Sequence, residues 1–214
     1  MHLCRGFSLI SMLVGLALSM IAMMTLMAGY RQVVLNAQTQ VRSGQSRAEV
    51  ASTLLTTAQL VQQAGWGVAP TATPPGGTAN TDIVLLSAAA VGGGSMSGTA
   101  VSITSTTAAG NALVWDTAIA GTTQCHALVA GAGGVGRYGP VNCTNASGWA
   151  SLAWGDGVTL IQGQSLASTP QFRTQIVSCW PFGTGPGGPQ VATRVDLVGF
   201  GSSTPSLCLP NISK

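Results

Sequence analysis

The cysteines are the residues whose type and spacing point most directly to chemistry. Four of the five lie late in the chain, at Cys125, Cys143, Cys179 and Cys208. An even number of cysteines in an oxidising compartment is typical of disulfide bonds, and four cysteines allow three pairings. A zinc site is not expected, because there is no Cys-x-x-Cys pair and His126 is the only histidine in this region.

Side chains that could form a catalytic constellation are sparse. A nucleophile needs a base beside it, and His126 adjoins Cys125, which we expect to be in a disulfide. Nothing in the spacing of the acidic residues indicates a paired-carboxylate site. These acids are Asp82, Asp116, Asp156 and Asp196. We therefore expect no enzymatic activity, no cofactor and no bound metal.

A glycine-rich run, Gly131-Ala132-Gly133-Gly134-Val135-Gly136, matches the G-x-G-x-x-G dinucleotide pattern in form. That pattern works only where a helix follows directly within a βαβ unit. Here Arg137-Tyr138-Gly139-Pro140 follows and interrupts any helix. The run predicts a glycine-rich loop and no nucleotide site.

The region that carries these residues has the pattern of an antiparallel sheet. From Pro70 onward, short β-branched runs alternate with Gly, Ser, Thr and Pro clusters. A long helix followed by such strands predicts an α+β fold in which the helix packs on the sheet. The expected strands are Asp82–Leu86, Val101–Thr106, Ala112–Trp115, His126–Val129, Val158–Ile161, Thr174–Trp180 and Ala192–Phe200.

The composition excludes two classes of protein. Only 6% of the 214 residues are charged, against about 25% in an average soluble domain. With 46% hydrophobic residues and a net charge of +3, the chain lacks the composition of a disordered protein. Eight Lys and Arg residues cannot form a large basic face, so nucleic acid is not an expected partner.

The excess of apolar residues is concentrated near the N-terminus. Phe7–Gly29 is a run of 23 residues without a charge. As a helix it would be roughly 34 Å long, enough to cross a hydrocarbon core of about 30 Å. A secretory signal peptide has a shorter apolar core and a small-x-small cleavage site after it, and no such site precedes Arg31. The run therefore predicts a transmembrane helix.

The same helix is expected to continue through Tyr30–Ala64, which contains no proline. Gly65, Gly67 and Pro70 would end it. Small and apolar residues recur at helical spacing and predict an amphipathic stripe that packs on the sheet. The stripe consists of Val34, Ala37, Val41, Gly44, Ala48, Ala51, Leu55 and Ala58. A coiled-coil stalk is the alternative, but a stripe built mainly from alanine makes a weak zipper.

The segment Arg5-Gly6-Phe7-Ser8-Leu9-Ile10, joined to an apolar helix, resembles the class III signal of type IV prepilins and type II secretion pseudopilins. The resemblance implies that prepilin peptidase removes residues 1–6 by cutting between Gly6 and Phe7 on the cytoplasmic face. It also implies that the new N-terminal Phe7 is then methylated. The fold implied is pilin-like, with a periplasmic head at residues 65–214.

The chain departs from the family at the fifth mature position, where Ser11 stands in place of the usual Glu. In the family, that carboxylate is thought to neutralise the N-terminal amine of a neighbouring subunit in the filament core, where an unpaired charge is costly. Ser11 cannot supply the charge. This favours a minor subunit at the filament tip, while a tolerated substitution remains the alternative.

Two shorter segments resemble a narrower group, the PilW-type minor pilins and their GspJ-type pseudopilin counterparts. One runs from Arg47 to Gly67 and ends in a Gln-Ala-Gly-Trp turn, and the other is Val191–Val198. Within the resemblance, we prefer the sequential disulfides Cys125–Cys143 and Cys179–Cys208. The second of these resembles the C-terminal disulfide loop of many pilins.

The resemblance implies a structural function rather than catalysis. The expected protein is a minor type IV pilin that takes part in pilus assembly, with prepilin peptidase, other minor pilins, the major pilin and inner-membrane lipid as partners. Its expected place is the bacterial inner membrane, as a single-pass protein with a periplasmic head, and then the pilus tip. A type II secretion pseudopilin and a competence pilin for DNA uptake are the alternatives.

Overall fold

The computed structural model describes residues 9–68, 77–166, 168–179, 190–201 and 204–213. The chain divides into two compact units, Met1–Ser46 and Arg47–Lys214. The described part of the first unit is helical, and the second contains the last turns of the same helix and all of the strands. We call the part of the second unit that follows α1, residues 65–214, the head.

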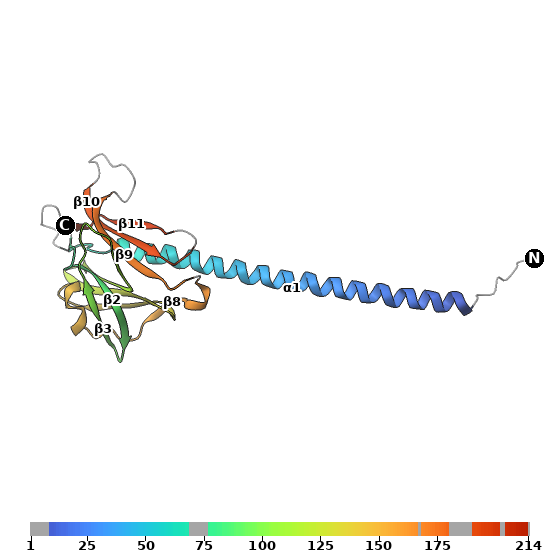
Figure 1. Cartoon of the computed structure of the whole chain (residues 1–214). Helices are drawn as coiled ribbons and strands as arrows, with labels where there is room; N and C mark the ends of the chain where they lie inside the picture. Colours follow the sequence, from blue (N-terminus) through green and yellow to red (C-terminus); the bar gives the residue numbers. More distant parts are fainter. Residues whose placement is uncertain (1–8, 69–76, 167, 180–189, 202–203, 214) are drawn as a thin grey trace, which may run out of the picture. The chain divides into compact units, whose positions relative to one another are not determined.

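One long helix, α1, runs over Leu9–Gln62 (Figure 1). Its 54 residues contain no proline and are rich in Ala, Leu and Met, which are good helix formers. The chain leaves the helix through a turn in which Gly65 and Gly67 have φ angles of +72° and +73°. Only glycine adopts this left-handed conformation without strain, and a Cβ at Gly67 would lie 2.1 Å from the Ala118 carbonyl oxygen. The predicted helix and its glycine stop are confirmed.

The larger sheet of the head has six strands in the order β3-β2-β5-β6-β7-β8, and every neighbouring pair is antiparallel. Tight glycine turns join several of these strands, as at Gly93 and Gly94, which have positive φ angles between β2 and β3. The strands are β2 (Ile83–Gly92), β3 (Ser95–Val101), β5 (Ala112–Ile119), β6 (Thr122–Gly131), β7 (Gly134–Asn142) and β8 (Val158–Gln162).

A second antiparallel sheet has the order β11-β10-β9-β4. Its strands are β4 (Ala108–Gly110), β9 (Gln171–Cys179), β10 (Gln190–Val198) and β11 (Ser206–Leu209). A short parallel pair joins β1 (Gly77–Thr78) to β12 (Ile212–Ser213). Two 3-10 helices, η1 (Ala146–Ser151) and η2 (Gly163–Ser165), flank β8 in the sequence.

The main hydrophobic core lies where the end of α1 meets both sheets. Val61 of the helix is buried with Leu113 and Trp115 of the larger sheet and with Phe172 and Leu197 of the second sheet. The structure therefore has the α+β architecture expected from the sequence, in which the long N-terminal helix packs its last turns against antiparallel sheets.

A second apolar cluster covers the opposite face of the larger sheet. Side chains alternate between the two faces along each strand, so Val114 enters this cluster while Leu113 and Trp115 enter the first. Trp154 closes the cluster from the segment after η1 and donates its indole N–H to the Trp149 carbonyl at 3.0 Å. The two clusters hold the sheet from both sides.

The predicted packing stripe on α1 was wrong in register except at Ala58, which is partly buried against the main core. Ala51 and Leu55 are exposed, and Leu55 keeps 68% of its surface accessible. The buried helix positions are Thr53, Thr57 and Val61. Thr53 is buried while its hydroxyl donates to the Leu160 carbonyl, so a count of apolar residues alone misses this face.

One strand prediction and one loop prediction were also wrong. Residues 102–107 form an irregular connection, because the strand expected at Val101–Thr106 ends at Val101 as part of β3. The glycine run expected as a loop forms the β6–β7 hairpin, and Gly139 and Pro140 lie inside β7. β11 and its pairing with β10 were not predicted.

Candidate functional site

The processing site falls outside the described residues. Gly6 and Phe7 precede Leu9, the first described residue, so their roles remain predictions from the sequence. Ser11 lies in the first turns of α1, and its side chain is exposed.

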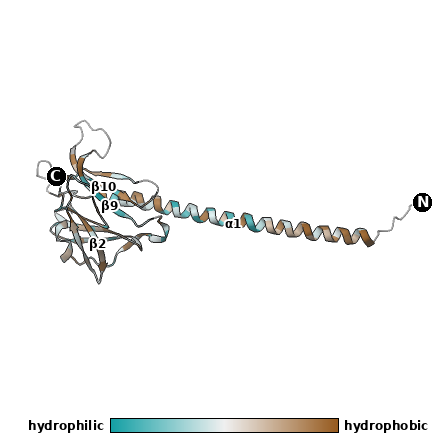
Figure 2. Ribbon diagram, in the orientation of Figure 1, coloured by the Kyte–Doolittle hydropathy of each residue, from teal (hydrophilic) through white to brown (hydrophobic). Residues whose placement is uncertain are grey.

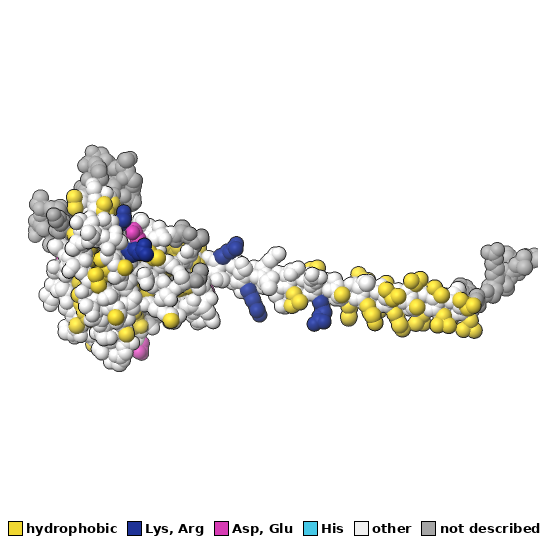
Figure 3. Space-filling view, viewed as in Figure 1, with side chains coloured by type: hydrophobic (Ala, Val, Ile, Leu, Met, Phe, Trp, Pro, Cys, Tyr) yellow, Lys and Arg dark blue, Asp and Glu magenta, His cyan; other side chains and the backbone are white. Residues whose placement is uncertain are grey.

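The N-terminal part of α1 has the length and composition of a membrane-spanning helix. No charged residue occurs between Leu9 and Tyr30, and the large apolar side chains in this stretch are all exposed within the chain itself. Figure 2 shows this part of α1 as predominantly hydrophobic, and Figure 3 shows apolar side chains covering its surface, with Lys and Arg only farther along the helix. The charges on α1 begin at Arg31.

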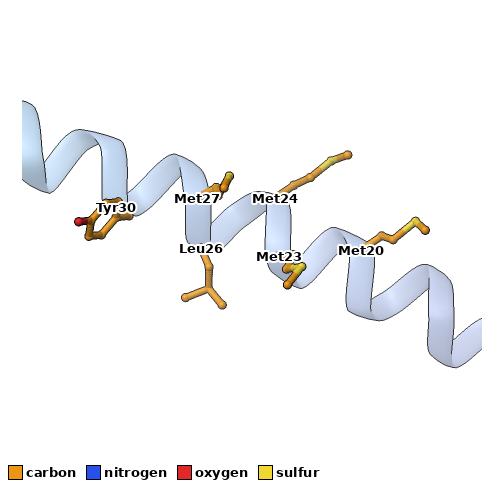
Figure 4. A pocket seen from close by; sticks show the side chains of 6 residues that line it. All are labelled: Met20, Met23, Met24, Leu26, Met27 and Tyr30. Carbon is orange, nitrogen blue, oxygen red and sulfur yellow. The ribbon is translucent and has the colours of Figure 1, made fainter.

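Methionines make up much of this apolar surface. Four of them, together with Leu26 and Tyr30, line a hollow of about 640 Å³ (Figure 4). These four are Met20, Met23, Met24 and Met27. Figure 4 shows these side chains projecting from more than one side of a single helix, so the hollow is space between side chains and cannot enclose a ligand. Flexible thioether side chains suit a surface that packs against lipid or against neighbouring helices of varied shape.

Two polar contacts anchor the last turns of α1 to the head. The Thr53 hydroxyl donates to the Leu160 carbonyl of β8 at 3.0 Å, and Thr53 is 4% exposed. One turn earlier, the Ser165 hydroxyl of η2 donates to a Glu49 carboxylate oxygen at 2.8 Å. β8 is an edge strand of the larger sheet, so the helix also covers part of an edge that would otherwise be open.

Both disulfides are formed in the sequential pairing, Cys125–Cys143 and Cys179–Cys208. The first joins strand β6 to the segment just after β7, its neighbour in the larger sheet. The second joins the end of β9 to β11 in the second sheet. Each Cα–Cα distance, 5.8 Å and 5.9 Å, lies within the normal range for a disulfide. The four cysteines therefore brace both sheets of the head.

The structure brings together two aspartates, Asp82 and Asp116, that are far apart in the sequence and were not expected to pair. Asp82 immediately precedes β2 and lies across from Asp116 of β5, in register with the Ile83–Trp115 pair. The Thr78 backbone N–H donates to Asp82 Oδ2, and the Ala146 N–H of η1 donates to Asp116 Oδ2 at 3.0 Å. Burial, with repulsion from the Asp82 carboxylate, raises the pKa of Asp116 well above its ordinary value.

His126 belongs to the helix-facing side of the same sheet. Its ring stacks on Trp115 with 5.7 Å between centroids, and its Nε2 lies 3.1 Å from the Thr117 hydroxyl. Burial, together with the positive charge of Arg137, lowers the pKa of His126 to about 4. Buried between these neighbours, His126 packs within the sheet.

No group of His, Cys, Asp and Glu that could hold a metal ion is found among the described residues. Of the tryptophans, Trp115 and Trp154 are buried and Trp66 is 63% exposed, while Trp180 lies outside the described residues. Comparison of the chain with family models, with curated proteins and with solved structures finds no match.

Proposed function

We propose that the chain is a minor type IV pilin of the PilW type that takes part in pilus assembly within a tip complex. The observation that carries this proposal is the Arg5–Ile10 segment, with its prepilin-type Gly6-Phe7 junction, joined to the uncharged start of α1. A long helix that packs its last turns on a disulfide-braced antiparallel head supports it.

Each part then has a physical role. The uncharged N-terminal part of α1 sits in the inner membrane before assembly, and afterwards packs among the helices of the filament core. The low charge of the head leaves subunit contacts to shape and apolar packing, with little electrostatic steering. Ser11 leaves the N-terminal amine of the neighbouring subunit without a carboxylate partner. A subunit of this kind therefore fits at the filament tip, where the repeating contacts between subunits end.

Deletion of the gene tests the proposal. Pili on the cell surface and twitching should be lost and should return with the wild-type gene on a plasmid, and sheared pili should contain the chain at low stoichiometry. Normal pili with failed enzyme export would identify a secretion pseudopilin instead. Normal pili with failed DNA uptake would identify a competence pilin.

The tip assignment has its own test in Ser11→Glu. If the missing carboxylate restricts the subunit to a terminal position, this variant should be more abundant in sheared pili than the wild-type chain. Ser19→Glu, a carboxylate elsewhere on the same helix, is the matched control and should give no increase. Equal abundance of Ser11→Glu and wild type would contradict the tip restriction.

A further inference from the structure

The head carries a preformed polar hollow of about 400 Å³ beside the Cys125–Cys143 disulfide. Its lining comes from the end of β7 and from the segment around η1, and contains no charged residue. Asn142, Thr144, Asn145 and Ser151 supply amide and hydroxyl groups, and Cys143 and Leu152 supply apolar surface. We call this the Asn142 hollow.

The backbone around the Asn142 hollow is held in place from several directions. The Cys143 N–H donates to the Thr123 carbonyl at 3.2 Å, and the Ser147 N–H donates to the Thr81 carbonyl at 2.9 Å. The buried Asp116 carboxylate accepts the Ala146 N–H, and the disulfide fixes Cys143 covalently. A site with this much support needs little ordering when a ligand enters, which favours binding.

Some of the polar side chains in the hollow make hydrogen bonds within the protein and others do not. The Asn145 side chain accepts the Ser147 hydroxyl at 2.7 Å, and the Ser151 hydroxyl donates to the Gly148 carbonyl at 2.9 Å. Within the described residues, the side chains of Asn142 and Thr144 make no hydrogen bond, and both are exposed. They are the groups able to bind something from solution.

The chemistry of this lining selects among ligand classes. A charged ligand would find no counter-charge, and an apolar ligand would leave the amide and hydroxyl groups unpaired. A neutral polyhydroxy ligand satisfies both conditions, because its hydroxyls pair with amides and its C–H faces cover Leu152 and the disulfide. We propose that the Asn142 hollow is a binding site for a neutral saccharide of one or two rings. This goes beyond the proposed pilus function and does not rest on it.

Saturation-transfer NMR on the full chain tests this, in a detergent without a sugar headgroup. The probes are glucose, galactose, mannose and N-acetylglucosamine, each titrated separately. We expect at least one to bind with a Kd of about 1–10 mM, as suits an open site with few hydrogen bonds. No binding by any of the four at tens of millimolar, several times the top of that range, would overturn the proposal.

Variants then locate the site. Asn142→Leu and Thr144→Val remove hydrogen-bonding groups at exposed positions and should each weaken binding about fivefold to tenfold. Gly148→Leu adds a side chain where a Cβ meets open space, and should block the hollow without disturbing the fold. Gly133→Leu, in the β6–β7 turn and equally open, is the matched control and should bind like wild type. Binding unchanged in all three hollow variants would place the ligand elsewhere and refute the proposal.

Discussion

The carboxyl groups of Asp82 and Asp116 lie side by side in the interior of the head, with Asp116 fully buried and Asp82 only 8% exposed. Neither takes part in an ion pair among the described residues. Each is bound instead by a backbone N–H, from Thr78 and from Ala146. Asp116 also accepts the Gly65 N–H on its main-chain oxygen at 2.9 Å. This pair therefore ties the turn after α1, β1, β5 and η1 to one point.

Two adjacent carboxylates cannot both be charged in such a place without a large cost, so burial and the neighbouring Asp82 raise the pKa of Asp116 to about 8. Its buried Oδ1 receives no hydrogen bond from the described residues. This oxygen can carry the proton.

Asp116→Asn should remove a pH dependence of stability. Burial raises the folded pKa of Asp116 to about 8, so between about pH 4 and pH 8 the folded head holds one more proton than the unfolded chain, and the free energy of unfolding falls as pH rises through this range. The slope is at most about 1.4 kcal/mol per pH unit. Asn cannot titrate, so the variant should be more stable than wild type at pH 8.

Near-UV circular dichroism during urea unfolding in detergent measures this, because all five tryptophans lie beyond residue 65. Asp156→Asn, at an exposed position, is the control and should follow the wild-type profile. A wild-type profile for Asp116→Asn between pH 6.5 and 8, within about 0.5 kcal/mol, would show that the pair does not share a proton.

His126→Phe should remove a second pH dependence of stability, opposite in sign to that of Asp116. The folded pKa of His126 is about 4 against an ordinary 6.5, so the unfolded chain binds more protons in that window. The contribution of His126 to stability is present above pH 6.5 and is lost as pH falls toward 4. In wild type this offsets the slope of Asp116 between those limits.

Phe keeps the stacking on Trp115 but cannot be protonated. The unfolding free energy of His126→Phe, relative to wild type, should therefore increase as pH is lowered from 6.5 to 4.5, measured by the same urea titrations. Parallel profiles for the two proteins over this range would contradict the low pKa assigned to His126.

Thr53→Val should loosen the end of α1 from the sheet. Val has nearly the same shape, but it leaves the Leu160 carbonyl without the hydroxyl that now donates to it, at a cost of about 1–2 kcal/mol. Thr56→Val is a matched control, because Thr56 is exposed and its hydroxyl bonds only within the helix, to the Ser52 carbonyl. Equal unfolding free energies for the two variants would mean that the anchor contributes nothing.

Loss of either disulfide should destabilise the head strongly. The bonds close loops with sequence separations of 18 and 29 residues, for which the chain-entropy estimate is about 3–4 kcal/mol each. The paired variants Cys125→Ala/Cys143→Ala and Cys179→Ala/Cys208→Ala avoid a leftover free thiol. Both should melt at lower temperature than the wild-type chain, and an unchanged melting temperature for either pair would contradict a bracing role.

The helix and its end could be predicted from sequence because both depend on local signals. An unbroken run of helix formers and the pair Gly65 and Gly67 fix them within a few residues. The buried face of α1 depends on what packs against it, and the fit of Thr53 to the Leu160 carbonyl is a tertiary contact with no local signal.

Strand β7 could not be predicted for a similar reason. Its glycines and Pro140 disfavour a strand, yet Gly136 and Gly157 leave room for the Tyr138 ring, and a Cβ at Gly157 would lie 2.4 Å from it. Pro140 lies beyond the part of β7 that pairs with β8, so its missing N–H breaks no bond on that side. The Asp82–Asp116 pair likewise depends on the register of β2 against β5, which joins residues 34 positions apart in the sequence.

The proposed pilin processing is tested by the intact mass of the protein purified from its native membrane. We expect a chain that lacks residues 1–6, begins at Phe7 and carries one added methyl group, while Gly6→Val keeps the leader and Gly15→Val is processed normally. An N-terminus that retains residues 1–6, or one created by cleavage beyond Gly29, would contradict the proposal that the chain is a type IV pilin.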